Sequence, residues 1–449
     1  DARYNSDAFA TATAQILAGH GLVPLLTATR VPTPLVPFGV GRYGCAAGVV
    51  VTASHNPPAD NGYKVYVGRS QIVPPTDSEI AEQIAAASGV SVRELPHGDA
   101  IEIVGDDLIA AYVERAASLV DADAPRDLRW VYTAMHGVGR ITVERVVEAA
   151  GFPAPALVAE QADPDPAFPT VAFPNPEEPG AMDLALALAR RTDADVAIAN
   201  DPDADRCAIA APFPTGWRML TGDELGALLA DDALRAGREG VYACSVVSST
   251  LLSTMAAAYG RPFETTLTGF KWIGRVPGLA YGYEEAIGYC TDPAFVPDKD
   301  GITALVRLLA LVARLRADGR TVADALEDIV RRYGLHHTAQ LSFRVEDVSI
   351  IAAAMARFRA APPATLAGEA VAASDLAMGW NGLPPTDGIL LEGATTRVVV
   401  RPSGTEPKLK CYLQVKLTPA ESADVAAARA AASEKMERVR ADVRAVLGL

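Results

Sequence analysis

The sequence predicts an α/β protein: several α/β units in succession, followed by an α+β end piece. Two observations carry this prediction. Short apolar runs stop in polar loops and are followed by helical patterns, and near the C-terminus strands precede one long helix. A chain of 449 residues is long enough for three or four domains with separate cores. Half of the residues are hydrophobic and 21% are charged, which is typical of a globular protein rather than a disordered one.

Periodicity and breaker residues place the elements along the chain. Thr76-Asp77-Ser78-Glu79 has the pattern of a helix N-terminal cap and predicts a helix over 76–87. The Asp-Ala-Asp-Ala-Pro stretch at 121–125 indicates a linker. The other predicted helices are 8–18, 140–150, 181–191, 223–236, 248–259, 301–317 and 420–446. The predicted strands are 49–51, 63–67, 130–134, 196–199, 241–247, 341–344, 396–400 and 410–416.

Charge and composition restrict the partners. The formal net charge is −15, which disfavours nucleic acid and anionic membranes as partners and favours solubility. Neither a signal peptide nor an uncharged apolar stretch of about 18 residues is present, so we expect a cytoplasmic protein with no membrane partner. Five cysteines without C-x-x-C spacing argue against a disulfide framework.

Ser54 and His55 form the first candidate site. They lie in Thr52-Ala53-Ser54-His55-Asn56-Pro57, directly after the apolar run 48–51, and Asn56-Pro57-Pro58 ends the strand because proline cannot continue a ladder. A hydroxyl nucleophile beside an imidazole can take part in group transfer. For this motif alone, a chance Ser-His pair in a surface turn is the better explanation.

Three aspartates in Asp201-Pro202-Asp203-Ala204-Asp205-Arg206 form the second candidate site. Side chains two residues apart share a face in extended backbone, so three carboxylates can turn toward one cation. Mg²⁺ prefers such ligands, whereas an EF-hand needs Gly and Glu where this chain has Arg206 and Pro212. A solvated Asx turn is the alternative. Arg206 favours the metal site, because a guanidinium beside a metal suits a shared phosphoryl group.

Two further loops indicate phosphate and sugar binding. Arg401-Pro402-Ser403-Gly404-Thr405-Glu406-Pro407-Lys408 follows the strand 396–400 and offers N–H groups, hydroxyls and cations to a phosphate. It lacks the Walker spacing, and an ordinary hairpin turn fits equally well. Gly282-Tyr283-Glu284-Glu285-Ala286-Ile287-Gly288-Tyr289 contains paired carboxylates, each able to accept two sugar hydroxyls. For this segment alone, a solvated acidic turn is the better explanation.

In chain order, these four segments resemble the phosphoserine, metal, sugar-recognition and phosphate-binding loops of the α-D-phosphohexomutase family. The resemblance covers almost the whole chain. It implies an isomerase, a phosphoglucomutase/phosphomannomutase that interconverts the 1-phosphate and 6-phosphate of glucose or mannose. The implied route passes through a phosphorylated Ser54 and a sugar 1,6-bisphosphate. The implied cofactors are Mg²⁺ and a catalytic sugar 1,6-bisphosphate as activator. The implied partners are small sugar phosphates, and we expect a monomer or a homodimer.

The resemblance also implies the roles of individual residues, through these motifs and through Asn61-Gly62-Tyr63-Lys64, Thr268-Gly269-Phe270-Lys271 and Asp298-Lys299-Asp300-Gly301. The implied catalytic residues are Ser54, His55, Lys64 and Arg206. The implied metal ligands are Ser54, Asp201, Asp203 and Asp205. The implied substrate-binding residues are Thr268, Gly269, Lys271, Glu284, Glu285, Lys299, Arg401, Ser403, Gly404 and Thr405.

By this resemblance the chain has four domains around a central cleft. Three similar mixed α/β domains are expected at 1–123 (phosphoserine loop), 124–237 (metal binding) and 238–336 (sugar recognition). A C-terminal α+β domain like the TATA-binding protein is expected at 337–449 (phosphate binding). Because Asp1-Ala2-Arg3-Tyr4-Asn5-Ser6 resembles a segment inside the family's first domain, we expect the sequence to omit an N-terminal piece.

Several alternatives stay open. Ala286-Ile287-Gly288-Tyr289 after the acidic pair resembles the branch with bacterial phosphoglucomutases, phosphopentomutases and glucose-bisphosphate synthases, which leaves the sugar undecided. A phosphopentomutase or a glucose 1,6-bisphosphate synthase is therefore the near alternative. A phosphatase or phosphotransferase with Asp201 or Asp203 as nucleophile is a second class. A non-enzymatic sugar-phosphate-binding protein is a third, which the joint presence of the serine, lysine, aspartates and arginine disfavours.

Overall fold

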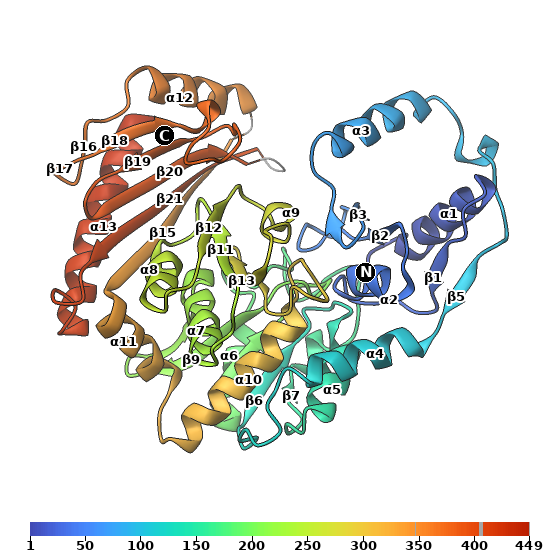
Figure 1. Ribbon diagram of the computed structural model, residues 1–449, viewed down its shortest axis with the longest axis horizontal. Helices are drawn as coiled ribbons and strands as arrows, with labels where there is room; N and C mark the ends of the chain where they lie inside the picture. The colour runs from blue at the N-terminus through green and yellow to red at the C-terminus, as the bar shows by residue number, and fades with distance from the viewer. Residues whose placement is uncertain (346, 404–406, 449) are drawn as a thin grey trace. The chain divides into compact units, whose positions relative to one another are not determined.

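The computed structural model describes residues 1–345, 347–403 and 407–448. The chain divides into two compact units, each built from two stretches of sequence: Asp1–Gly240 with Phe270–Ala323 (unit 1), and Val241–Gly269 with Asp324–Leu449 (unit 2). Figure 1 follows the chain by colour and labels its elements. Among the described residues, no helix has both the length and the apolar character that crossing a membrane requires.

The first part of unit 1 surrounds the loop that carries Ser54. β2 (Ala47–Val51) pairs antiparallel with β3 (Tyr63–Val67), so the loop between them is anchored at both ends by one ladder. β1 (Leu25–Thr27) pairs in parallel with β5 (Glu102–Val104). The other elements of this part are α1 (Ser6–Gly19), α2 (Leu35–Tyr43), β4 (Ser70–Gln71), α3 (Thr76–Ala87) and α4 (Asp106–Ala117).

A cavity of about 700 Å³ lies in this part, with residues of α1, α2, β1 and β2 in its wall. Its lining is mainly apolar and includes Leu25, Val36, Val50 and Leu108. The described residues that line it include none of those predicted to be catalytic or to bind metal or substrate. This cavity is therefore not the candidate active site.

The central sheet of unit 1 supports the aspartate loop. Its strand order is β10-β9-β8-β6-β7, with β6 (Trp130–Thr133) and β8 (Val196–Ala199) parallel and fully buried. α6 (Asp183–Thr192) packs on this sheet through Ala185 and Ala189. Because the aspartates follow β8 directly, they lie at the carboxyl end of a buried strand, where α/β proteins place ligand loops. The remaining elements are α5 (Gly139–Ala149), β7 (Ala156–Leu157), β9 (Ala208–Phe213), β10 (Gly216–Met219) and α7 (Gly222–Arg235).

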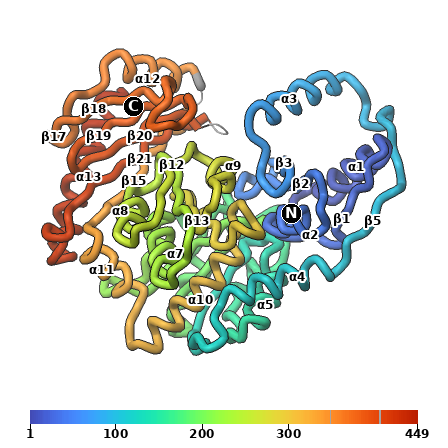
Figure 2. The backbone as a smooth tube through the Cα atoms, in the orientation of Figure 1, coloured from blue at the N-terminus to red at the C-terminus, as the bar shows by residue number. Residues whose placement is uncertain are grey.

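The last part of unit 1 is a hairpin followed by a long helix. β13 (Leu279–Glu284) and β14 (Gly288–Cys290) are antiparallel, and the Glu284-Glu285 pair lies at their turn. α10 (Gly301–Ala317) begins at Asp300, whose carboxylate accepts from the N–H groups of Ile302 and Thr303. α10 lies beside α5, as the trace in Figure 2 shows. The short α9 (Phe270–Ile273) precedes the hairpin.

Unit 2 contains an antiparallel sheet with the order β15-β21-β20-β19-β18. Side chains alternate along its central strand β20 (Thr396–Pro402), because residues two apart share a face. Val398 and Val400 pack in the core formed with α13 (Val425–Leu447), which runs along β21 in Figure 1. Val399 belongs to a second cluster with Val246 and Val247, so the segment 241–269 covers the other face.

The other elements of unit 2 follow from the same sheet. Its strands are β15 (Leu335–Arg344), β18 (Ala372–Asp375), β19 (Ile389–Glu392) and β21 (Lys408–Leu417). The segment 241–269 contributes β11 (Val241–Ser245), α8 (Leu251–Ala258) and β12 (Phe263–Thr266). α12 (Val348–Ala360) packs on α13, and β16 (Thr365–Leu366) pairs with β17 (Glu369–Ala370). α11 (Val322–Tyr333) contains the boundary between the two units.

The predicted elements differ from the structure mainly at their ends. The helix predicted at 420–446 begins only at Val425, because the carboxylate of Asp424 caps it. The capping pattern at Thr76 was wrong in detail: Pro75 occupies the N-cap position of α3 and no side chain caps it. The capping box of unit 1 is instead at α7, where Thr221 and Glu224 bond reciprocally. Among the longer helices, the prediction missed α2, α4, α11 and α12. Of these, α2 contains proline and glycines, which weaken the helical pattern.

One partly buried ionic cluster joins three elements of unit 2. Glu369 of β17 accepts hydrogen bonds from the N–H and hydroxyl of Thr395, from the Thr396 hydroxyl, and from Lys435 of α13 at 2.5 Å. Burial raises the pKa of Glu369, but the hydrogen bonds from Lys435 and Thr395 outweigh it and bring the pKa to about 2. The ionised carboxylate therefore ties β17 to both the sheet and α13.

We expect Glu369→Gln to lower the midpoint of thermal unfolding at pH 7, by the equivalent of about 1–3 kcal/mol, because Lys435 loses its anionic partner. The folded pKa of about 2 lies below the ordinary 4.5. The stabilisation is therefore full above about pH 5 and is lost as the pH falls toward 2. Thermal unfolding followed by circular dichroism at pH 7 and pH 3 tests this. The difference in unfolding midpoint between variant and wild type should be smaller at pH 3.

The matched control is Glu434→Gln, which removes an exposed i,i+4 pair with Arg438. An exposed pair of this kind contributes about 0.5 kcal/mol or less, so its melt should hardly move. An equal difference in unfolding midpoint between Glu369→Gln and wild type at both pH values would contradict the stabilising role of the ionised Glu369 carboxylate.

Candidate active site

Ser54 sits in a left-handed conformation on the loop between β2 and β3. Its φ is 51°, which is unusual for a residue with a Cβ and must be held by its surroundings. The N–H of Ser54 donates to Thr52 Oγ1 at 2.8 Å. Its Oγ donates to Asp201 Oδ2 at 2.9 Å and lies 3.3 Å from His55 Nδ1. The predicted nucleophile thus touches both the predicted imidazole and the aspartate loop, 147 residues away.

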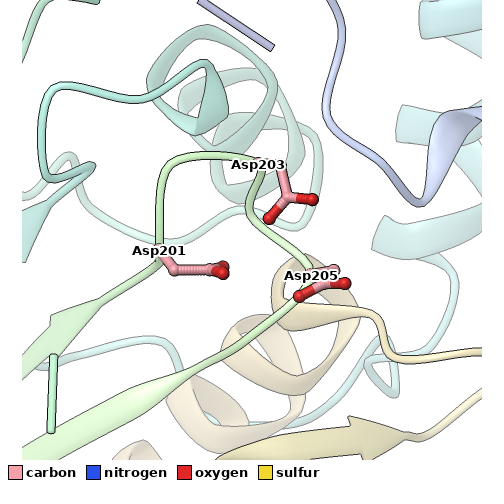
Figure 3. Close-up of side chains that lie close together, drawn as sticks. All are labelled: Asp201, Asp203 and Asp205. Atoms are coloured by element: carbon pink, nitrogen blue, oxygen red, sulfur yellow. The ribbon is translucent and has the colours of Figure 1, made fainter. Parts of the chain in front are cut away.

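Asp201, Asp203 and Asp205 converge on one point. Each offers an oxygen within 4.8 Å of the others, and all three residues are fully buried. Figure 3 shows the three side chains on a single loop, which Ala204 turns with a φ of 54°. Burial, and next the charges of Asp203 and Asp205, raise the pKa of Asp201 well above its usual range. Three buried carboxylates at this spacing repel one another unless cations compensate them.

The donor set of this loop fits a divalent cation. Asp203 Oδ1 and Asp205 Oδ1 are buried and have no hydrogen-bond partner, although a buried carboxylate oxygen normally has one. Asp201 is the third residue of the group, and its Oδ2 accepts the hydrogen bond from Ser54 Oγ. All-oxygen ligands of this kind suit Mg²⁺. The residues on the loop therefore match the group that the sequence predicts there.

Lys64 of β3 neutralises part of this charge. Its Nζ lies 2.8 Å from Asp203 Oδ2 and 2.5 Å from Asp205 Oδ2. Burial by itself lowers the pKa of Lys64, but the two aspartates raise it overall, so the side chain is a firmly held ammonium. Lys64 lies opposite Val50 in the ladder that anchors the serine loop, so the same two strands hold both the serine loop and this ammonium.

Arg206 joins the aspartate loop to the glutamate hairpin. Its Nη1 donates to the carbonyl of Ala286 at 2.6 Å, and its backbone bridges to Gly288. Nε lies 3.8 Å from Asp205 and 4.0 Å from Asp201, and it is buried without a hydrogen-bond partner. A buried guanidinium N–H with no acceptor is a natural donor to an anionic ligand.

Glu284 and Lys299 are two further buried charged residues near the aspartate loop. Burial raises the pKa of Glu284, and Lys299 and Arg206 oppose that rise. Lys299 Nζ lies 3.3 Å from Asp205 Oδ2 and 3.7 Å from Asp298 Oδ1. Glu285, the other predicted sugar reader, is half-buried at the hairpin turn. Lys299 was predicted to bind substrate, and here it also compensates a predicted metal ligand.

Close backbone approach at Gly301 brings two of these loops together. A Cβ on Gly301 would lie 2.2 Å from the carbonyl oxygen of Arg206, so the start of α10 packs directly on the aspartate loop. A larger side chain there would force the backbone to shift.

Of the remaining predicted residues, Lys271 belongs to unit 1 and the other described ones belong to unit 2. Lys271 of α9 pairs with Asp77 of α3 at 3.7 Å. Thr268 and Gly269 end the first stretch of unit 2. Arg401 and Ser403 lie at the end of β20, where the Ser403 N–H donates to Lys408 O at 2.8 Å. Gly404 and Thr405 lie outside the described residues. The roles of these residues stay predictions.

Two threonines that sequence reasoning missed hold a metal-ligand candidate. The Thr33 hydroxyl donates to Asp203 Oδ2 at 2.7 Å, and Thr52 Oγ1 lies 3.2 Å from the same oxygen. Thr52 stands two residues before Ser54, and its position could have drawn attention. Thr33 carries no local signal, since its partner is 170 residues away.

Four domain families match consecutive stretches of the chain. They are the phosphoglucomutase/phosphomannomutase α/β/α domain I over residues 1–90, domain II over 110–212, domain III over 221–333, and the C-terminal domain over 344–432. Together they describe the four-domain architecture with mixed α/β sheets that the sequence predicted.

Relatives similar in sequence include three kinds of phosphomutase or synthase. The chain is 43% identical over 431 residues to a probable phosphomannomutase of Haemophilus influenzae, covering 94% of this chain and 88% of that one. It is 34% identical to a human phosphopentomutase, covering 93% and 76%. It is 32% identical to a human glucose 1,6-bisphosphate synthase, covering 93% and 75%.

Solved structures agree on the fold. A phosphoglucomutase/phosphomannomutase family protein of Burkholderia thailandensis superimposes with a TM-score of 0.70 at 19% identity, covering 99% of this chain and 94% of that one. The open form of pp63/parafusin, a phosphoglucomutase of Paramecium, gives 0.74 at 18% identity, covering 100% and 88%. The chain therefore belongs to the phosphoglucomutase/phosphomannomutase family, the α-D-phosphohexomutases, and is a phosphomutase.

Proposed function

We propose that this phosphomutase interconverts hexose 1-phosphate and hexose 6-phosphate, of glucose, mannose or both, with Ser54 as the phosphoryl carrier. The observation that carries the proposal is the hydrogen bond of 2.9 Å from Ser54 Oγ to Asp201 Oδ2. It couples a nucleophile to a buried group of three carboxylates, as phosphoryl transfer beside a metal requires. The relative named phosphomannomutase, at 43% identity, supports the hexose.

The transfer has two halves that mirror one another. In the first, the bond from phosphorus to Ser54 Oγ breaks and a bond to the free sugar hydroxyl forms. The hydroxyl gives up its proton to a base, and Oγ regains a proton to become the serine hydroxyl. The resulting sugar 1,6-bisphosphate reorients, and Oγ then attacks the other phosphoryl group. The bond from that phosphorus to the sugar oxygen breaks, the sugar oxygen takes up a proton to become a hydroxyl, and Oγ loses its own proton. The imidazole of His55, 3.3 Å from Oγ, is suited to exchange that proton.

Buried cations stabilise the transferring group. Arg206 Nε is buried without a hydrogen-bond partner and lies 3.8 Å from Asp205 Oδ1, and Lys64 compensates Asp203 and Asp205. We propose that a bound Mg²⁺, held by Asp201, Asp203, Asp205 and a phosphoryl oxygen on Ser54, supplies further charge neutralisation. We assign Lys64 a part in proton transfer as well, following the family resemblance of its motif.

The sugar and its second phosphate are bound by the other predicted residues. Glu284 and Glu285 at the hairpin turn are the proposed readers of sugar hydroxyls, each able to accept two hydrogen bonds. Lys299 lies close to Asp205, and we propose that it binds the substrate together with Glu284 and Glu285. The remaining proposed contacts are Thr268, Gly269, Lys271, Arg401, Ser403, Gly404 and Thr405. Anchoring the phosphate that does not react turns binding energy into orientation of the one that does.

Ser54→Ala should abolish mutase activity, by roughly 10⁴-fold or more, because the covalent route needs Oγ. A coupled assay measures turnover, and intact mass measures a labile phosphoryl group that the variant cannot carry. Ser118→Ala, which removes an exposed hydroxyl bonded to its own helix, is the control and should behave as wild type. Retained turnover in Ser54→Ala would instead favour an aspartate nucleophile.

Chelation with EDTA should remove activity, and Mg²⁺ should restore it. Mg²⁺ should also raise the midpoint of thermal unfolding, because a ligand at about 100 times its dissociation constant stabilises by about 2.7 kcal/mol. Asp205→Asn removes one charge of the crowded group and should largely lose this Mg²⁺-dependent rise. Asp193→Asn, at an exposed pair with Arg129, should keep it. An identical rise in both variants would rule out this metal site.

A panel of sugar phosphates tests the substrate. With catalytic bisphosphate added, glucose 1-phosphate or mannose 1-phosphate should turn over faster than ribose 1-phosphate, as judged by kcat/KM. The second candidate is a pentose mutase, favoured by the relative named phosphopentomutase at 34% identity. Fast conversion of ribose 1-phosphate without conversion of either hexose would establish it in place of the first. Accumulation of glucose 1,6-bisphosphate from a phosphoryl donor would indicate synthase activity.

A further inference from the structure

Arg3 lies inside the loop that carries Ser54. The residue is 2% exposed, and its guanidinium is enclosed by backbone carbonyls. Nη2 donates to the carbonyls of Ser54 at 2.7 Å and Asn56 at 2.6 Å. Nη1 donates to the carbonyls of Pro57 at 2.7 Å and Asp60 at 3.0 Å. The side chain therefore binds the loop at four points, on and after the nucleophile.

Every N–H of this guanidinium has an acceptor. An arginine has five donors in a fixed planar fork, and the fifth, on Nε, donates to Asp1 Oδ2 at 3.2 Å. One face of the fork lies over the ring of Phe168, 5.0 Å from its centroid. A buried charge with all donors satisfied and one face stacked is held in a single orientation.

Asp1 connects Arg3 to the N–H of Ser54 through Thr52. Its Oδ2 also accepts from the Thr52 hydroxyl at 2.8 Å, and Thr52 Oγ1 in turn accepts the N–H of Ser54 at 2.8 Å. Arg3 thus reaches the carbonyl of Ser54 directly and its amide through two intermediates. Both peptide groups that flank the Ser54 Cα are fixed, which determines where its side chain points.

This constraint is needed because the conformation of Ser54 is unfavourable. A left-handed φ at a residue with a Cβ is less favourable than the right-handed region, because Cβ approaches the backbone oxygen. The loop would relax if its carbonyls were released, and Oγ would move away from Asp201. We propose that Arg3 is a positioning residue for the phosphoryl carrier, holding the serine loop in the conformation that aims Ser54 Oγ at the aspartate group.

The inference rests on the proposed role of Ser54. Its chemistry is specific to arginine: a lysine ammonium offers three donors at one point and cannot serve four carbonyls spread along a loop. Arg3→Lys keeps the charge and most of the volume but should release the loop. A residue needed only for folding would instead change stability and leave the folded enzyme with normal turnover.

Arg126 provides a matched control. It also donates to backbone carbonyls, those of Ala150 and Asp121 among them, and it also stacks on a phenylalanine ring, Phe152, at 5.0 Å. Its carbonyls belong to the segment before β6 and the end of α5 rather than to the serine loop. Arg126→Lys therefore measures the general effect, on stability and turnover, of losing an arginine that binds several backbone carbonyls.

The test compares Arg3→Lys and Arg3→Ala with Arg126→Lys and wild type in the full chain. We expect kcat per phosphorylated enzyme to fall about 10²-fold in both Arg3 variants with KM within about threefold, because a misplacement near 1 Å has an effect of that size. Hydrogen exchange of residues 52–62 should be faster in the Arg3 variants alone. Added guanidinium should partly rescue Arg3→Ala, and methylammonium should not.

Wild-type kcat in folded Arg3→Lys, or unchanged exchange in residues 52–62, overturns the proposal. If Arg3→Ala does not fold, Arg3→Lys decides by the same two measurements. If neither variant folds while Arg126→Lys does, Arg3 is a folding residue and the proposal fails. If wild type converts none of the sugar phosphates, the proposed function fails instead, and the exchange comparison still tests the clamp.

Discussion

The arrangement of unit 1 depends on the confinement of three buried carboxylates in one loop. Asp201, Asp203 and Asp205 lie within 4.8 Å of one another in a fully buried position. Such a group is unfavourable by itself, because burial and mutual repulsion both oppose ionisation. The fold compensates with cations drawn from separate elements, Lys64 of β3 and Lys299 before α10. The loops that must meet for phosphoryl transfer are thereby attached to a single electrostatic centre.

The position of Ser54, the proposed phosphoryl carrier, beside that centre adds a second constraint. Ser54 adopts a left-handed φ, which its neighbours must maintain. Its N–H donates to Thr52 Oγ1, its carbonyl accepts from Arg3, and Thr52 Oγ1 also lies 3.2 Å from Asp203 Oδ2. The conformation of the serine loop is therefore linked to the position of Asp203, a proposed metal ligand. A change in the serine loop would therefore move Asp203, and a change at Asp203 would move the loop, as expected for a site whose chemistry relies on positioning.

The main feature of unit 2 is an antiparallel sheet that is covered on both faces. The sheet is covered by α12 and α13 on one face and by the segment 241–269 on the other, so β20 is buried on both sides. A sheet held in this way is a rigid support for the loop that follows Pro402. Rigid support suits a loop proposed to anchor a phosphate, because a ligand bound at one end then gains orientation at the other.

The sequence by itself determined the strand-then-loop placement of Ser54 and of the three aspartates, because those motifs are local and follow short apolar runs. It also determined the family, and with it the four-domain architecture. Only the tertiary structure decided which cations serve which aspartates, and that Thr33 and Arg3 support the site. Arg3 and Ser54 are 51 residues apart, and Thr33 and Asp203 are 170 apart. Contacts at such separation depend on how whole elements pack, and no local pattern of residues encodes them.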